Sequence, residues 1–184
     1  MEQSLAKFHG QLIKNAQILF KLSLGFSASL PELGYLSSFA SYRHTANADE
    51  LKLTREEEGV GSTLLEHVAT YTLAVQIDTA LGALYPTRFE SADQMLRSAA
   101  WIARLVRNSF AHNPFAPKWK TYSECENKQF SVGGLISLDT TGLNGKYVDR
   151  GHYGGPLALL KLSEFIQERL ERDAPTQSAF VERP

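Results

Sequence analysis

Apolar residues recur at spacings of three and four along most of the chain, and this pattern predicts amphipathic α-helices. The first such stretch covers residues 4–24, and the longest covers residues 62–84. Two more cover residues 92–110 and 157–173. A shorter stretch at residues 31–42 begins with a proline, which suits the first position of a helix, so we expect a short second helix there.

Capping patterns indicate where some of these helices begin. A serine or threonine followed three residues later by Glu or Gln can cap a helix N-terminus reciprocally. Two pairs of this kind lie just before predicted helices: Thr54 with Glu57 and Ser91 with Gln94. Because Gly59 and Gly61 follow the first pair, we expect that helix to start only at Ser62. The last helix is expected to open at Pro156, and residues 44–50 to form a polar connector.

Glycine and proline interrupt the helical pattern between residues 115 and 155. Residues 130–139 read FSVGGLISLD, which predicts a strand, and Asn144-Gly145 is a typical tight-turn pair. We expect residues 146–148 to pair back onto this strand. The predicted fold is therefore mostly α: an up-and-down bundle of four to five helices, with a small β-hairpin insertion before the last helix.

Length and composition favour one domain in a reducing compartment. The chain has 184 residues, and we assign residues 1–172 to a single helical domain that contains the insertion 115–155. Residues 173–184 are expected to be a flexible tail. Cys125 is the single cysteine, so no intramolecular disulfide can form. The first 20 residues are too polar for a signal peptide or a membrane span, so we expect a cytoplasmic protein without membrane contact.

The helix at residues 92–110 runs into the sequence RNSFAHNP, which concentrates polar residues at its end. On a helical projection Arg107 borders the apolar stripe, where an arginine needs a carboxylate partner or a cleft. His112 follows five residues later, about 140° away on a continuous helix. Because Pro114 disfavours helical geometry at the residue before it, a broken last turn could bring His112 back towards Arg107. Asn108, four residues before His112, could orient its ring.

Basic and aromatic residues gather around this motif, although the net charge of the chain is only −1. Residues 94–123 contain no Asp or Glu. The basic residues of this stretch are Arg97, Arg104, Arg107, Lys118 and Lys120. The aromatic residues Trp101, Trp119 and Tyr122 interleave with this stretch. Such a mixture is typical of phosphate and base contacts, so Arg104, Lys118 and Lys120 are candidate nucleic-acid-binding residues. The alternative is that these cations only complement the helix dipole.

The spacing of Arg107, Asn108 and His112 at the end of a long helix resembles the HEPN superfamily (higher eukaryotes and prokaryotes nucleotide-binding). Its hallmark is an arginine followed four to six residues later by a histidine. The helical layout resembles that family over most of residues 1–172, whereas the stretch 118–155 is not part of its minimal fold. The resemblance implies a metal-independent endoribonuclease without a cofactor, in which two protomers bring their motifs together.

In such an enzyme His112 would act on the ribose 2′-hydroxyl or the leaving oxygen, Arg107 would hold the phosphate, and Asn108 would support one of them. These roles agree with a side chain that titrates near neutral pH and one that stays charged. The resemblance further implies RNA as a partner and a homodimer. It is also typical of toxin–antitoxin or phage-defence systems, where an antitoxin or accessory protein would bind the chain.

Two non-catalytic alternatives remain open. In an RNA- or nucleotide-binding module, Arg107 would pair with Glu66 or Asp78 of the preceding helix, and His112 would cap its own helix. In a protein-docking module, Trp101 and Leu105 would present a face opposite the apolar stripe. The scattered histidines form no metal-binding pattern, so no metal site is expected.

Overall fold

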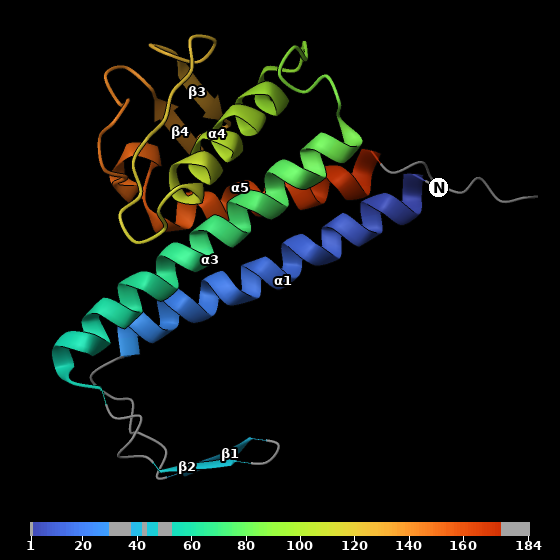
Figure 1. Ribbon diagram of the computed structural model, residues 1–184. Coiled ribbons are helices and arrows are strands. Elements are labelled where there is room, and N and C mark those ends of the chain that lie inside the picture. The colour runs from blue at the N-terminus through green and yellow to red at the C-terminus, as the bar shows by residue number, and fades with distance from the viewer. Residues whose placement is uncertain (1, 30–37, 42–43, 48–52, 174–184) are drawn as a thin grey trace, which may run out of the picture.

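The computed structural model describes residues 2–29, 38–41, 44–47 and 53–173. Within these residues the chain folds into a bundle of long helices with a small two-stranded hairpin before the last helix, which confirms the predicted fold class (Figure 1). The α-helices are α1 (Glu2–Ser29), α3 (Arg55–Leu84), α4 (Gln94–Ala111) and α5 (Pro156–Asp173).

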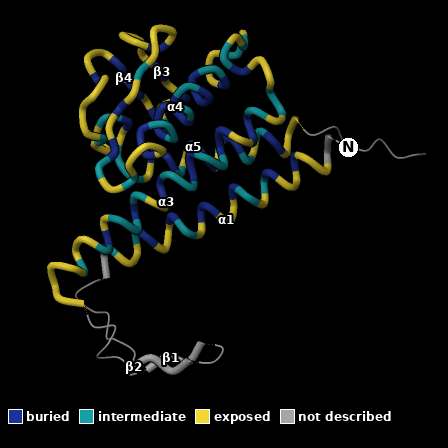
Figure 2. The backbone as a smooth tube through the Cα atoms, in the orientation of Figure 1, coloured by how far each residue is buried: buried dark blue, intermediate teal, exposed yellow. Residues whose placement is uncertain are grey.

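The helices α1 and α3 lie antiparallel along each other, and α4 and α5 pack against the C-terminal half of α3 (Figure 1). Buried residues gather where the four helices meet, whereas residues 53–61 at the start of α3 are mostly exposed (Figure 2). The largest fully buried aliphatic side chains are Ile13, Leu73, Ile77, Leu81, Ile102, Leu105, Leu138, Leu159, Leu162 and Ile166. Their burial removes apolar surface from water and is the main stabilising term of the fold.

The start of α3 differs from the prediction. The capping box forms as expected: the Glu57 N–H donates to Thr54 Oγ1 over 3.2 Å, and the Thr54 N–H donates to Glu57 Oε2 over 2.7 Å. The helix nevertheless begins at Arg55 and continues through Gly59 and Gly61. The box satisfies free N–H groups, and the acidic first turn complements the positive helix end, which together offset the low helix propensity of two glycines.

The first residue of α4 also shifts from the prediction. Asp93, not Ser91, is the N-cap, and its carboxylate accepts the Leu96 N–H over 3.0 Å. The Ser91 hydroxyl instead accepts the Asp93 N–H over 3.2 Å and so fixes the turn that leads into the helix. Aspartate caps at least as well as serine, so the nearer residue takes the role.

Residues 38–41 were expected to be helical, and this prediction is wrong. They form strand β1 (Ser38–Ser41), which pairs antiparallel with β2 (His44–Asn47), a segment that was expected to be a connector. Ser37, Ser38 and Ser41 are weak helix formers because serine competes for backbone hydrogen bonds. Residues 31–37 of the predicted helix lie outside the described residues, as does the predicted tail from residue 174 onwards.

The insertion contains the predicted hairpin, but its turn lies elsewhere. Strand β3 (Gln129–Val132) pairs with β4 (Ile136–Asp139), and the stretch expected to be one strand therefore folds on itself. Gly133 and Gly134 form the turn with φ of +49° and +74°, a conformation that favours glycine. Tyr147, expected to pair onto the strand, makes an isolated bridge with Lys118 instead.

The hairpin packs over the face of α4 that was considered for protein docking. The Trp101 ring stacks on Phe130 of β3 with 5.9 Å between centroids, and Leu105 is fully buried. The insertion therefore covers the two residues that a docking face on α4 would need exposed.

Candidate functional site

Asp78, in the buried part of α3, is the centre of a cluster of guanidinium groups. Its Oδ2 accepts from Arg107 Nη1 over 2.7 Å, and its Oδ1 accepts from Arg88 Nη2 over 3.2 Å. Arg104 Nε lies 3.7 Å from the same Oδ1. Three positive groups and one negative group leave two net positive charges. Only 4% of the Asp78 side chain is exposed, whereas 35% of Arg104 and 41% of Arg107 are.

The aromatic ring of Phe89 holds two of these guanidinium groups in place. The guanidinium carbons of Arg88 and Arg104 lie 4.6 Å and 4.5 Å from its centroid. Phe89 in turn contacts Trp101, with 4.6 Å between ring centroids. Cation–π contact and aromatic packing therefore fix the direction of the charged groups.

A hollow of about 560 Å³ opens beside this cluster. It is lined by Phe89, Trp101, Arg104, Arg107, Asn108, Tyr122 and Glu124. Four residues of α4 line it, at spacings that place them on one side of the helix: Trp101, Arg104, Arg107 and Asn108. We call this hollow the α4 pocket. With Glu124 included, one net positive charge remains around it, so the α4 pocket is suited to an anionic ligand that carries a flat ring.

Asn108 does not orient His112. Its Nδ2 donates to the hydroxyl of Tyr122 over 2.9 Å, which ties the end of α4 to the insertion. The helix ends at Ala111, as expected, but its C-cap His112 keeps helical angles of φ −86° and ψ −36°. The last turn is therefore not broken, and helical geometry places His112 about 140° from Arg107 around the helix axis. His112 is exposed and does not line the α4 pocket.

The two predicted lysines also lie apart from the α4 pocket. The Lys118 ammonium lies 4.6 Å from the ring centroid of Tyr147, and Lys120 is exposed. Neither lines the pocket. Of the six predicted site residues, the structure thus brings together Arg104, Arg107 and Asn108, and it leaves His112, Lys118 and Lys120 outside.

Arg88, Phe89 and Glu124 also border this site, although the sequence pattern did not predict them there. Arg88 and Phe89 lie in the connector between α3 and α4, which carries no periodic pattern. The Arg88 side chain contacts Asp78, ten residues earlier in the sequence. This contact depends on the path of the connector, which a periodic pattern does not predict. The one available signal was Asp78 itself, a carboxylate among apolar positions, which requires a cation when it is buried.

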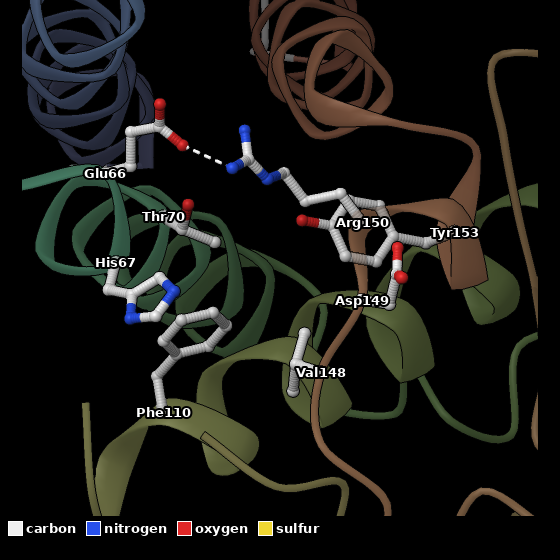
Figure 3. Close-up of a pocket in the computed structure, with 8 residues that line it drawn as sticks. All are labelled: Glu66, His67, Thr70, Phe110, Val148, Asp149, Arg150 and Tyr153. Carbon is white, nitrogen blue, oxygen red and sulfur yellow. Dashed lines mark ion pairs between the residues drawn. The ribbon is translucent and has the colours of Figure 1, made fainter. Parts of the chain in front are cut away.

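A second, smaller hollow lies where α3 meets the end of α4 and the 3₁₀-helix η2 (Arg150–Tyr153), as Figure 3 shows. Its lining includes Glu66 and Arg150, which form an ion pair of 2.6 Å. Glu66 also accepts a hydrogen bond from Ser27 of α1. The carboxylate was a candidate partner for Arg107, but the structure pairs it with the insertion.

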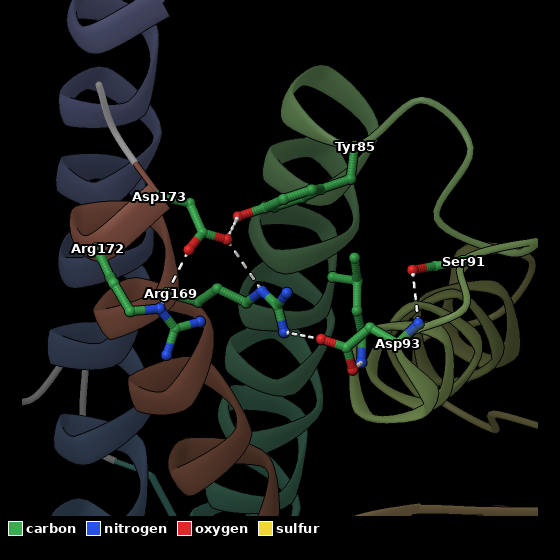
Figure 4. A network of polar contacts seen from close by, with 7 residues as sticks. Tyr85, Ser91, Asp93, Arg169, Arg172 and Asp173 are labelled. Carbon is green, nitrogen blue, oxygen red and sulfur yellow. Dashed lines mark hydrogen bonds and ion pairs between the residues drawn. The ribbon is translucent and has the colours of Figure 1, made fainter.

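A third charged cluster joins the ends of three helices (Figure 4). Arg169 of α5 donates to Asp93 over 2.6 Å and to Asp173 over 3.2 Å, and the Tyr85 hydroxyl donates to Asp173 over 2.8 Å. Burial, together with Asp173, raises the pKa of Tyr85 to about 12. The Leu96 N–H, together with Arg169, lowers the pKa of Asp93. We interpret these contacts as structural, because they link the ends of three helices and none of these residues lines either hollow.

Cys125, the single cysteine, lies fully buried in the insertion. Burial raises the pKa of its thiol, which disfavours the reactive thiolate. The part of the chain that the structure describes contains no group of three or more His, Cys, Asp or Glu side chains placed to hold a metal ion. None of the described helices is both long and apolar enough to cross a membrane.

Comparisons with protein families, with characterised proteins and with solved structures find no significant match for this chain.

Proposed function

We propose that the chain binds single-stranded RNA or a nucleotide at the α4 pocket, as a HEPN-like binding module. The observation that carries the proposal is that Arg104 and Arg107 share one hollow with Trp101 and Tyr122. Arginine forks onto phosphate oxygens, and an aromatic ring stacks on a base of any sequence. The preference for RNA rests on the resemblance of Arg107, Asn108 and His112 to the HEPN motif.

The hydrogen bonding of Arg107 and its separation from His112 favour binding over catalysis within one chain. Its guanidinium carries five N–H donors, and among the described residues its single hydrogen bond goes to Asp78. The remaining donors can meet a phosphate, while Asp78 keeps the group in position. His112 lies on another side of the helix, so one chain does not offer an acid–base group and a phosphate clamp to the same atom.

The test is fluorescence anisotropy of a labelled single-stranded RNA with the purified protein in excess EDTA. Arg107→Ala removes one charge-assisted contact, so binding should weaken about tenfold or more. Arg55→Ala is the matched control, because Arg55 opens α3 at the far end of the bundle from α4 (Figure 1). Equal affinities of parent and Arg107→Ala, or no RNA binding by the parent, would overturn the proposal.

A second candidate function is metal-independent RNA cleavage by a homodimer. The observation in its favour is that His112 is exposed at the end of α4, as is Phe115, three residues later, at 66%. A partner copy could bring its own His112 to the Arg107 of this chain, since the two cannot meet within one chain. The same resemblance supports a cytoplasmic role in a toxin–antitoxin or phage-defence system, with an antitoxin or accessory protein as partner.

Cleavage is tested by incubating RNA with the protein in excess EDTA and analysing the ends of the products. The parent should produce 2′,3′-cyclic phosphate ends, and His112→Ala should abolish cleavage without changing the circular dichroism spectrum. A variant that cuts as fast as the parent would contradict this second function, as would a dimeric parent that does not cut.

A further inference from the structure

The smaller hollow between α3, the end of α4 and η2 has the features of a built site rather than a packing gap. It has a volume of about 270 Å³, which is near the lower end of the range for small-ligand pockets. Its lining combines polar side chains with aromatic and apolar ones: Glu66, Thr70, Asp149, Arg150 and Tyr153 with His67, Phe110 and Val148 (Figure 3). We call it the η2 pocket.

The Tyr153 hydroxyl provides a hydrogen-bond donor at the wall of the hollow. The residue is only 1% exposed, and its phenol oxygen points into the hollow in Figure 3. Burial raises its pKa above the ordinary value for tyrosine, so the phenol keeps its proton and can donate a hydrogen bond into the hollow. A ligand that accepts a hydrogen bond would therefore meet a donor already in place.

The surrounding groups are held in place and keep hydrogen-bonding capacity. Glu66 is fixed by Ser27 and by Arg150, and each oxygen of its carboxylate can accept a further bond. His67 Nδ1 lies 2.8 Å from the carbonyl oxygen of Pro114 and donates to it, which fixes the orientation of the ring. The Arg150 guanidinium, 45% exposed, retains free donors at the mouth of the hollow.

The charges of the η2 pocket exclude a phosphate as its main ligand. Glu66 and Asp149 are negative and Arg150 is positive, which leaves one net negative charge. A neutral ligand with alternating donors and acceptors fits this set better. The His67 and Phe110 rings, 5.4 Å apart, supply an aromatic wall against which a flat ring can pack.

We infer that the η2 pocket binds an uncharged nucleobase, either of a free nucleoside or of a base that leaves an RNA strand. Tyr153 donates to the base, Glu66 and Arg150 meet its polar edge, and Phe110 contacts its face. This inference is independent of the α4 pocket, because the two hollows share no residue.

The first arm of the test is isothermal titration calorimetry with adenosine, guanosine, cytidine and uridine, and with ribose and inorganic phosphate as comparison ligands. Tyr153→Phe removes only the phenol oxygen and should weaken nucleoside binding about tenfold. Tyr147→Phe is the matched control, since Tyr147 is 63% exposed and lies outside the pocket. Thr70→Val provides a second variant of nearly unchanged shape.

The second arm measures RNA binding of the same variants and separates the two sources of the base. Nucleoside binding that depends on Tyr153 supports a site for a free ligand. RNA binding that depends on Tyr153, without nucleoside binding, supports a base that leaves a strand. The inference is wrong if ribose or phosphate binds as well as any nucleoside, or if Tyr153→Phe changes neither nucleoside nor RNA binding.

Discussion

Replacing Asp78 by asparagine removes one negative charge from beneath three guanidinium groups and leaves the shape of the side chain nearly unchanged. The consequences differ among the three arginines because their exposure differs. The Arg88 side chain is 10% exposed, and the substitution leaves it as a buried charge without a carboxylate. Arg104 and Arg107 are 35% and 41% exposed and can turn towards water.

The magnitude follows from this difference. Removal of one partner from a buried ion pair costs about 3–5 kcal/mol, because the other charge stays desolvated. Pairs near the surface contribute only about 0–1 kcal/mol each. Arg88 therefore dominates, and we expect Asp78→Asn to lower the free energy of unfolding by about 3–5 kcal/mol. For a chain of this size the melting temperature should fall by about 6–20 °C.

The assay is urea and thermal unfolding followed by circular dichroism, with coincident probes as a check of two-state behaviour. Glu164→Gln is the matched control, because Glu164 is 48% exposed and lies 4.0 Å from Lys21. The control should cost less than about 1 kcal/mol. A loss of stability no larger than that of the control would refute the view that Asp78 holds buried charge in place.

Two further predictions concern the ends of the helices. Thr54→Ala removes the capping box of α3 and should cost about 1 kcal/mol in urea unfolding, whereas Thr63→Ala, on the exposed side of the same helix, should cost much less. The pKa of Tyr85 is raised to about 12, so between pH 10 and pH 12 the unfolded chain loses this proton first and stability falls. Tyr85→Phe should make that alkaline fall shallower, and an unchanged slope would show that the Tyr85–Asp173 contact does not contribute.

The long helices could be predicted from the sequence because their apolar spacing matches the faces that they bury. The exceptions arise where a local feature, a capping box or a pair of glycines, outweighs the pattern of the surrounding residues. At Gly59 and Gly61 the capping box of Thr54 and Glu57 outweighs two weak helix formers. At Gly133 and Gly134 two residues that tolerate positive φ turn a predicted strand into a hairpin.

The candidate site was predictable only where its residues share one helix. Arg104, Arg107 and Asn108 follow from helical spacing, and Asp78 was one of two proposed partners for Arg107. Arg88 and Tyr122 reach the site through loops, whose paths are set by packing across the whole fold. The η2 pocket needed the structure as well, since Glu66 and Arg150 are far apart in the sequence and meet only when the insertion folds against α3.

The most direct test of the central claim is the salt dependence of RNA binding. Each phosphate interaction that a substitution removes should make the slope of log affinity against log salt concentration shallower by about 0.7. We expect this change for Arg107→Ala, about twice as much when Arg104→Ala is added, and none for Arg55→Ala. Slopes equal to that of the parent in all three variants would show that the α4 pocket does not bind the RNA backbone.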